Sequence, residues 1–336
     1  MCCGVENMMI AIIGGSGFIG TRLTRRLLAA GHTVKILDKQ DSKYYSELRT
    51  FADVRDIDSL KQGLNSNIEC VINLAAEHRD DVQPKSLYDE VNVDGAENVC
   101  KVCSEHGIKK IIFTSSVAVY GFAPLNTNET GEINYFNDYG RTKWLAEGKY
   151  RAWLNSDTNN SLTIIRPTVV FGEQNRGNVY NLLRQISSGF FPFIGDGKNR
   201  KSMAYVENIA AFIEFSLNNA PGEHLFNYID KPDFDMNTLT QEVYTILGKP
   251  HHKIFHWSYW LGYVGGLCFD LLAKITGKKL AISSIRVKKF CANTLFDSIN
   301  IQKTGFKPPV LLKDGLYNTV KYEFIDKVQG HNFYTE

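Results

Sequence analysis

The sequence predicts an α/β fold built on a doubly wound parallel sheet, and two observations predict it. First, the apolar run 8–13 ends in glycines and continues as an amphipathic pattern, typical of a strand, a tight turn and a helix. Second, short apolar runs alternate with helical patterns over the first half of the chain. Strands that alternate with helices form parallel sheets with helices on both faces. With 336 residues and 43% hydrophobic content, the chain is able to bury a sizeable core.

The predicted elements follow in order along the chain. Strands are expected at 8–13, 33–37, 48–54, 70–76 and 110–116, with a helix ending near Leu64 and a long helix from Pro84 to His106. In such sheets, ligands bind at the carboxyl ends of the strands. Four small or polar residues fall at these ends: Gly14, Asp38, Ala75 and Ser116. The sequence therefore predicts a ligand site along that edge.

The glycines after the first strand have the spacing of a dinucleotide-binding turn. Gly15-x-Gly17-x-x-Gly20 opens a helix directly after a strand, the context that makes this motif informative. In such turns the first glycine permits the bend, the second lets backbone N–H groups approach a pyrophosphate, and the third lets helix and strand pack closely. The helix N-terminus adds the positive end of a dipole. The glycines alone would also suit a βα turn that binds nothing.

Asp38 favours a bound dinucleotide, and NAD in particular. It ends the second strand, near the offset of about 20 residues at which an acid reaches the adenosine ribose. Its carboxylate would accept hydrogen bonds from both ribose hydroxyls and would repel a 2′-phosphate. The sequence therefore favours NAD over NADP, although the adjacent Lys39 is able to bind a phosphate.

A tyrosine and a lysine then appear with catalytic spacing. Tyr139 and Lys143 lie four residues apart in a predicted helix that continues through Trp153, so their side chains share one face. A lysine ammonium beside a phenol favours the phenolate, which lets Tyr139 act as a general base. Ser116 is placed to hold the substrate oxygen. If Tyr-x-x-x-Lys stood alone, it would be explained by an exposed helix face. That alternative does not explain why the motif follows a dinucleotide turn and a strand that ends in Ser-Ser.

Composition and cysteine usage exclude several other classes. A net charge of +2 gives no global reason to expect nucleic acid as a partner. Seven scattered cysteines, and a start without an apolar signal segment, suit a reducing cytoplasm. Cys100 and Cys103 have redox or zinc spacing, yet they lie in a helical pattern without a second pair. We therefore expect buried helix cysteines and no metal site.

Six motifs are spread over the chain: Gly14-x-x-Gly17-x-x-Gly20, Asp53-Val54, Leu74-Ala-Ala76, Ser115-Ser116 with Val119-Tyr-Gly121, Tyr139-x-x-x-Lys143 and Arg166-Pro167. Together they resemble the extended short-chain dehydrogenase/reductase family, in its sugar epimerase and dehydratase branch. The resemblance implies a Rossmann NAD-binding domain over 8–166. It also implies a smaller C-terminal α/β substrate-binding lobe over 167–330, which crosses back to the sheet in places, and a homodimer formed through a helix bundle.

The resemblance also implies roles for the matching residues. Tyr139 would be the acid and base, Lys143 would hold the nicotinamide ribose, and Ser116 would bind the reacting hydroxyl. The implied NAD contacts are Gly14, Gly17, Phe18, Ile19, Gly20, Asp38, Lys39, Asp53, Val54, Leu74, Ala75, Ala76, Tyr139, Lys143 and Pro167. Dehydratases of this branch carry Thr-Asp-Glu where this chain has Ser116-Val-Ala118. The acid and base that expel water are absent, which disfavours dehydration.

The stretch 254–290 combines aromatic and basic residues. No residue from Ile254 to Phe269 is formally charged, and this run is shorter than the ~20 residues that a spanning helix needs. Its aromatic residues include Trp257, Tyr259, Trp260, Tyr263 and Phe269, and the basic residues that follow are Lys274, Lys278, Lys279, Arg286, Lys288 and Lys289. This order suits peripheral contact with an anionic membrane. A core helix with a solvated basic face is the alternative.

Longer strings resemble a narrower group of that family, the bacterial 4-epimerases of lipid-linked N-acetylglucosamine. They lie at 37–42, 75–81, 173–181, 201–205, 275–279 and 286–291. This resemblance implies NAD-dependent interconversion of GlcNAc- and GalNAc-diphospho-undecaprenol for O-antigen or surface polysaccharide assembly, at the cytoplasmic face of the inner membrane. The implied substrate contacts are Ser115, Ser116 and Tyr139, with Arg176, Asn178, Arg200 and Lys201 as candidates for the diphosphate.

Other functions stay open at this point. A soluble 4-epimerase of UDP-GlcNAc or UDP-glucose would use the same catalytic residues, with 254–290 as core or dimer interface. A 4-keto sugar reductase would consume reduced cofactor stoichiometrically. A redox-sensing scaffold would bind NAD without catalysis, but it would not require Ser116, Tyr139 and Lys143 together.

Overall fold

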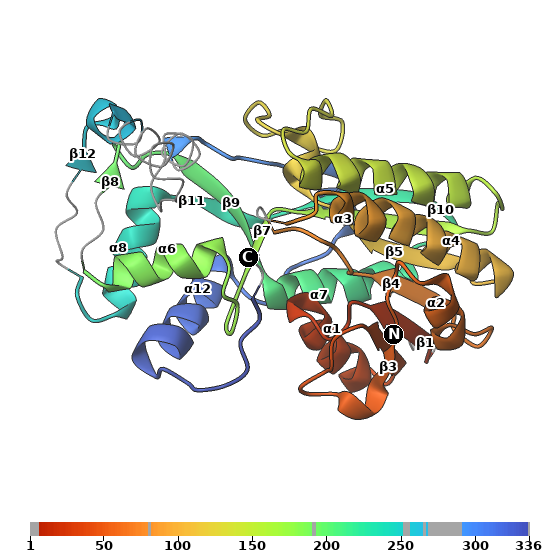
Figure 1. The fold of residues 1–336 in the computed structure, drawn as a ribbon. Coiled ribbons are helices and arrows are strands. Elements are labelled where there is room, and N and C mark those ends of the chain that lie inside the picture. The colour runs from red at the N-terminus through yellow and green to blue at the C-terminus, as the bar shows by residue number, and fades with distance from the viewer. Residues whose placement is uncertain are drawn as a thin grey trace.

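A computed structural model of the chain describes residues 7–79, 82–189, 193–250, 256–264, 267 and 291–334. Its larger unit is a seven-stranded parallel sheet in the order β10-β6-β5-β4-β1-β2-β3. The strands are β1 Met9–Ile13, β2 Thr33–Asp38, β3 Arg49–Phe51, β4 Cys70–Asn73, β5 Lys110–Thr114, β6 Ser161–Pro167 and β10 Gly222–Tyr228. The predicted doubly wound parallel sheet is confirmed (Figure 1).

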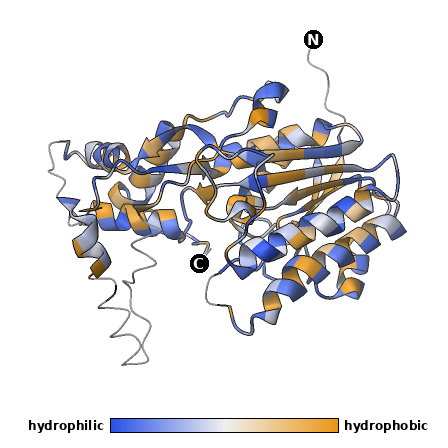
Figure 2. Ribbon diagram, turned by 90° about the horizontal axis from the view of Figure 1, so that it is seen from above, coloured by the Kyte–Doolittle hydropathy of each residue, from blue (hydrophilic) through white to orange (hydrophobic). Residues whose placement is uncertain are grey.

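Helices cover both faces of this sheet, and hydrophobic residues fill the strands between them (Figures 1 and 2). One layer contains α2 Ile57–Gly63, α4 Gly95–Glu105 and α5 Asp138–Leu154. The other contains α1 Phe18–Ala29, α7 Val206–Phe215 and α11 Ile299–Thr304. Alternate residues of β1 belong to the two cores, so the strand reads as a continuous apolar run, as expected for a sheet buried on both faces.

Three strands end earlier than the sequence predicts. β3 covers 49–51 rather than 48–54, β4 ends at Asn73 rather than Ala76, and β5 ends at Thr114 rather than Ser116. The neighbouring strand sets the first two limits, because β2 ends opposite Phe51 and β1 ends opposite Asn73. The backbone N–H groups of Ala52, Leu74 and Ser115 each donate one more hydrogen bond to the neighbouring strand. Beyond these residues the chain leaves the sheet at its carboxyl edge, where a ligand is expected.

The long helix predicted from Pro84 to His106 is confirmed as three consecutive elements, α3 Ser86–Asp89, η2 Glu90–Asp94 and α4. The middle element is a π-helical turn, a rare geometry that is frequent at functional sites. Within it, the Asn92 Nδ2 donates to the Glu77 carbonyl and to the Thr142 hydroxyl, both at 2.9 Å. The π turn thus joins the loop after β4 to α5. The two cysteines predicted to be buried in this helix are buried in α4.

The smaller unit is a lobe beside the carboxyl edge of the sheet (Figure 1). Its helices are α6 Asn178–Ser187, α8 Met236–Ile246 and α12 Leu312–Val320. Its strands are β7 Val169–Phe171, β9 Arg200–Tyr205 and β11 Asp230–Asp235 in one sheet, and β8 Phe193–Ile194 paired with β12 His256–Trp257. The chain enters the lobe after β6 and returns to the sheet for α7, β10 and α11, so 167–330 contains elements of both units.

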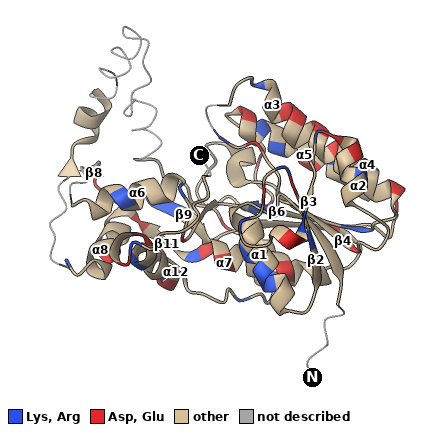
Figure 3. Cartoon of the chain, turned by 60° about the horizontal axis from the view of Figure 1, so that its bottom comes forward, with Lys and Arg blue, Asp and Glu red and all other residues tan. Residues whose placement is uncertain are grey.

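Of the aromatic and basic stretch 254–290, only 256–264 and 267 are described, and the basic residues from 274 to 289 lie outside the described residues. The helical turn at 259–264, beside β8, carries no charged residue (Figure 3). Five large apolar side chains in and next to this turn are exposed: Trp257, Trp260, Leu261, Val264 and Leu267. No helix in the described parts of the chain has the length and apolar character to cross a bilayer.

Candidate active site

The glycine turn between β1 and α1 leaves room only for backbone. Gly14 has a φ of +78°, and a Cβ there would lie 2.8 Å from the Ala75 backbone nitrogen. A Cβ on Gly20 would lie 2.6 Å from the Gly15 Cα. Gly17 caps α1 without a side-chain hydrogen bond, and the first turn of the helix contains no acid. The positive end of α1 is therefore open to an anion.

Asp38 is joined to this turn by hydrogen bonds. Its Oδ2 accepts from the Ser16 N–H at 3.0 Å and its Oδ1 accepts from the Gln40 N–H at 2.9 Å. Burial raises the pKa of Asp38, and the two backbone hydrogen bonds oppose that shift. Each oxygen keeps a second lone pair, so the carboxylate is able to accept from ribose hydroxyls as well.

The other predicted cofactor residues lie along the same edge. Phe18 and Ile19 begin α1, residues 74–76 follow β4, and Pro167 ends β6. Asp53 and Val54 follow β3, and Lys39 is exposed beside Asp38. Arg55 binds the Asp53 carboxylate at 2.6 Å, and this hydrogen bond holds the Asp53 pKa below its usual range. The turn without Cβ atoms, the open helix end and the acid after β2 fit NAD.

The structure brings Ser116 and Tyr139 together. Tyr139 lies in the first turn of α5, which Asn137 caps by accepting from the Gly140 N–H at 2.9 Å. Burial raises the pKa of Tyr139 to about 12, and a hydrogen bond with Ser116 opposes the shift. Ser116 itself caps a short helical turn, because its Oγ accepts from the Ala118 N–H at 3.1 Å. The serine is therefore held in place while it contacts the phenol.

Lys143 lies behind this pair, fully buried. Its Nζ donates to the Thr114 carbonyl at 2.7 Å. Burial lowers the pKa of Lys143 to about 7, with the Glu147 carboxylate acting in the opposite direction. The depressed Tyr139 pKa that the sequence predicts is thus not found. Burial of the phenol dominates, because Lys143 directs its ammonium to a backbone carbonyl.

A buried ion pair supports these residues, and sequence reasoning missed it. Arg166 donates to both oxygens of Glu147, through Nε at 2.8 Å and Nη2 at 2.6 Å. The Ser115 hydroxyl also donates to Glu147, at 2.6 Å. Ser115 therefore faces this pair in the interior rather than Tyr139. The sequence did contain two signals for this ion pair. Glu147 follows Lys143 by one helical turn, and Arg166 belongs to one of the family motifs.

His78 is a further side chain that the sequence did not single out. Its ring lies edge-on to that of Tyr139, with centroids 6.5 Å apart. The residue follows the short Ala75-Ala76 segment and is partly exposed. It therefore lies beside the Tyr139 phenol.

The four residues expected to bind a diphosphate lie on two elements of the lobe. Arg176 and Asn178 are at the start of α6, where the Arg176 guanidinium contacts Glu323 at 2.9 Å and stacks on Tyr180. Arg200 and Lys201 begin β9, and the Lys201 Nζ donates to the Ala292 carbonyl at 2.6 Å. Burial lowers the pKa of Lys201 to about 8.

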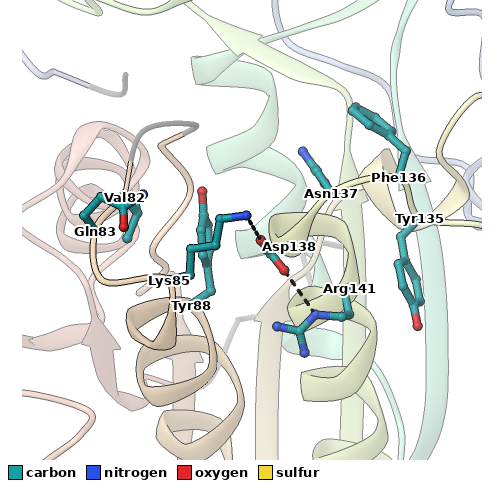
Figure 4. Close-up of a pocket in the computed structure, with 9 residues that line it drawn as sticks. All are labelled: Val82, Gln83, Lys85, Tyr88, Tyr135, Phe136, Asn137, Asp138 and Arg141. Carbon is teal, nitrogen blue, oxygen red and sulfur yellow. Dashed lines mark hydrogen bonds and ion pairs between the residues drawn. The ribbon is translucent and has the colours of Figure 1, made fainter. Parts of the chain in front are cut away.

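A surface hollow of about 470 Å³ lies beside the start of α5 (Figure 4). Asp138 stands between two cations there, 3.4 Å from Lys85 and 3.4 Å from Arg141. Arg141 also binds Asp89, at 2.7 Å. Both cations of this hollow are thus paired with carboxylates. Within the described residues, no group of His, Cys, Asp and Glu side chains is arranged to hold a metal ion.

Residues 10–227 match the model of the NAD dependent epimerase/dehydratase family. The chain belongs to this family. It is 52% identical over 321 residues, 95% of this chain and 96% of the relative, to the N-acetyl-alpha-D-glucosaminyl-diphospho-ditrans,octacis-undecaprenol 4-epimerase of Escherichia coli O157:H7. It is 27% identical to the UDP-glucose 4-epimerase of Vibrio cholerae, over 96% of this chain and 98% of that one.

Among solved structures, a UDP-glucose 4-epimerase from Thermotoga maritima superposes with a TM-score of 0.75. The match covers 96% of this chain and all of that chain, at 20% identity. It supports the fold of both units. The family resemblance predicted from the motifs is confirmed, and NAD is the cofactor of the family.

The buried lysine gives a testable pH dependence of stability. Because the folded-state pKa of Lys143 is lowered to about 7, the folded protein binds fewer protons than the unfolded chain between about pH 7 and pH 10.5. The wild type therefore gains stability from this residue as pH rises through that window. We expect the melting temperature of Lys143→Met, relative to wild type, to fall by a few degrees between pH 6 and pH 9.5 in NAD-free protein. A constant difference across this range would contradict the assigned burial of the ammonium.

Proposed function

We propose that the chain is an NAD-dependent 4-epimerase that interconverts GlcNAc-diphospho-undecaprenol and GalNAc-diphospho-undecaprenol. One observation carries the proposal: the 52% identity, over nearly the whole of both chains, to an Escherichia coli enzyme named for this substrate. The meeting of Ser116 and Tyr139 at the sheet edge that carries the glycine turn supports it. The absence of the dehydratase trio at 116–118 is consistent with it.

The protein's own residues perform the proton chemistry. Tyr139 accepts the proton of the sugar O4 and later returns it, while Ser116 donates a hydrogen bond to that oxygen. When bound, NAD supplies the hydride acceptor and donor for C4, and a positive charge that favours the phenolate. Lys143 holds the ribose hydroxyls and, when protonated, adds a second positive charge behind the phenol.

The diphosphate is held by the lobe in this proposal. The N-terminus of α6 has no acid in its first turn and no side-chain cap, so its N–H groups are able to bind an anion. Arg176 stands next to it, and Arg200 and Lys201 begin β9. Charge-assisted hydrogen bonds there anchor the substrate while the oxidised sugar turns over.

Conversion of two substrates by the purified protein, without added cofactor, tests the proposal. UDP-GlcNAc and GlcNAc-diphospho-undecaprenol are supplied in parallel reactions, with Tyr139→Phe as the inactive control. We expect turnover of the lipid-linked sugar. Turnover of UDP-GlcNAc alone would make the protein a nucleotide-sugar epimerase. Conversion only after reduced cofactor is added, with stoichiometric consumption of that cofactor, would make it a reductase.

Peripheral docking on the inner membrane, at its cytoplasmic face, belongs to the same proposal. The exposed group Trp257, Trp260, Leu261, Val264 and Leu267 supports it, together with the six basic residues that follow in the sequence. Trp260 is 70% exposed, far more than expected for a core position. We commit to an anionic bilayer as the occupant, because the proposed substrate is anchored there.

We expect the double substitution Trp260→Ala with Leu261→Ala to weaken binding to phosphatidylglycerol vesicles by about tenfold or more, since two exposed apolar side chains leave the interface. Vesicle co-sedimentation measures this. Leu311→Ala is the matched control, because Leu311 is 68% exposed on another part of the lobe. Equal vesicle binding by the double variant and wild type would remove the support that these residues give to docking.

The proposal also includes a homodimer through α4 and α5. These helices pack side by side in the outer layer and carry acidic and basic residues together (Figure 3), and Leu145 of α5 is exposed among them. Light scattering on the purified protein tests the dimer, and a monomer at micromolar concentration would refute it.

A further inference from the structure

The segment 330–334 runs from the lobe to the glycine turn. Phe333 pairs in parallel with 174–176, donating its N–H to the Gln174 carbonyl and accepting from the Arg176 N–H, both at 2.8 Å. Its buried ring packs against Phe18, with centroids 5.8 Å apart. Phe18 is the first residue of α1, directly after Gly17. The end of the described chain is thus packed on the first turn of the nucleotide-binding helix, between the two units (Figure 1).

Arg22 joins this segment to the turn at 173–176. Its guanidinium carbon lies 5.3 Å from the ring centroid of Phe18 and 5.5 Å from that of Phe333. Its Nη2 donates to the Glu173 carbonyl and to the Gln174 Oε1, both at 2.9 Å. The arginine is 7% exposed. Helix α1 and the two segments of the lobe therefore form one packed unit beside the glycine turn.

Tyr44 connects the same unit to the loop that follows Asp38. The Gln174 Nε2 donates to the Tyr44 hydroxyl at 2.7 Å, and the His331 ring lies edge-on to Tyr44 with centroids 6.4 Å apart. Gln174 has a φ of +70°, a conformation that a residue with a side chain adopts only where its surroundings enforce it. Its two side-chain hydrogen bonds, to Tyr44 and Arg22, are such surroundings.

These contacts reach both walls of the cofactor edge. One wall is the glycine turn, which Asp38 binds through the Ser16 N–H at 3.0 Å. The other is the loop 39–45, which ends in the Tyr44 contacts. The Ser16 hydroxyl also donates to the Gln40 carbonyl at 3.1 Å, which joins the turn to the loop directly. The loop's contacts with Gln174 and His331, and the contact of α1 with Phe333, add to this bond in opposing separation of the two walls.

We propose that Tyr44, Gln174 and Phe333 form a latch that retains NAD in the protein through successive turnovers. The inference rests on the proposed epimerase function, because an epimerase returns its cofactor to the starting state in each cycle and has no need to exchange it. The three residues act through the loop and α1, so they are positioning residues. Their contribution is to the rate of NAD release rather than to the proton chemistry at Tyr139.

The rate of NAD release measures the latch without reference to activity. The full-length protein is loaded with radiolabelled NAD, and the label that remains bound is followed after a chase with excess unlabelled NAD. Tyr44→Ala is the deciding variant, since Tyr44 is 45% exposed and its loss leaves the folded core intact. Phe333→Ala is the second variant. Tyr334→Ala is the matched control, because the neighbouring Tyr334 is 74% exposed.

We expect Tyr44→Ala to release NAD about tenfold faster or more, Phe333→Ala at least as fast, and Tyr334→Ala at the wild-type rate. The kcat of Tyr44→Ala at saturating NAD should stay at the wild-type value, while its activity without added NAD falls. Release from Tyr44→Ala at the wild-type rate would overturn the latch, whatever Phe333→Ala does. A wild type that binds no NAD would instead refute the cofactor assignment, and a wild type that retains NAD but does not epimerise would refute the proposed function alone.

Discussion

Tyr139→Phe is expected to lower turnover of the lipid-linked sugar by about 10³-fold, because it removes the hydroxyl that contacts Ser116 from the first turn of α5. The aromatic ring remains, so the packing against His78 is kept. We therefore expect the variant to retain NAD and to melt within a few degrees of wild type. Single-turnover and steady-state rates, measured beside the NAD content, check this.

Tyr135→Phe is the matched control for this result. Tyr135 lies four residues before Tyr139, ahead of α5, and is 40% exposed, so the loss of its hydroxyl should leave the rate unchanged. Activity of Tyr139→Phe within tenfold of wild type would show that another group moves the O4 proton, and His78 would then be the first candidate. Loss of NAD from Tyr139→Phe would indicate a binding role rather than a proton-transfer role.

The parts of the fold that depend on periodicity and glycine spacing were predictable from the sequence. The succession of strands and helices along the chain, the glycine turn and the position of Asp38 follow from local patterns that the fold preserves. The ends of β3 and β4 were not predictable, because they depend on where the paired strand stops. A single sequence does not show which strands pair with each other.

The candidate site shows the same division. Ser116 and Tyr139 were predicted to act on the same substrate oxygen, and the structure places them within hydrogen-bond distance of each other. Ser115 was predicted to contact the substrate, whereas its hydroxyl donates to Glu147 in the interior. Adjacent residues at a strand end point to opposite faces, so one of the two serines must face inward. Which one does so depends on the buried carboxylate, and that partner comes from α5.

Glu147→Ala is expected to lower the free energy of unfolding by about 3–5 kcal/mol, because it leaves the Arg166 guanidinium buried without its counter-charge. Glu147 is 0% exposed and Arg166 is 2% exposed. Arg166 would keep its hydrogen bond to the Tyr120 hydroxyl, at 2.6 Å, and its position over the Tyr120 and Trp144 rings, but none of these carries a negative charge. Chemical denaturation of the purified variant measures the change. Glu97→Ala is the matched control, since Glu97 pairs with Lys149 on exposed positions of α4 and α5, and such pairs contribute less than about 1 kcal/mol.

Replacement of both residues by apolar side chains separates the contribution of the charges to stability from that of side-chain packing. In the double variant Glu147→Leu with Arg166→Met no buried charge is left uncompensated, so it should be less destabilised than the sum of its single variants. It still leaves the Ser115 and Tyr120 hydroxyls without these partners, which keeps it below wild type. Additive single effects would show that Glu147 and Arg166 act independently. Coupling between them would mean that β6, which carries Arg166, and α5, which carries Tyr139 and Lys143, are held together by one buried ion pair.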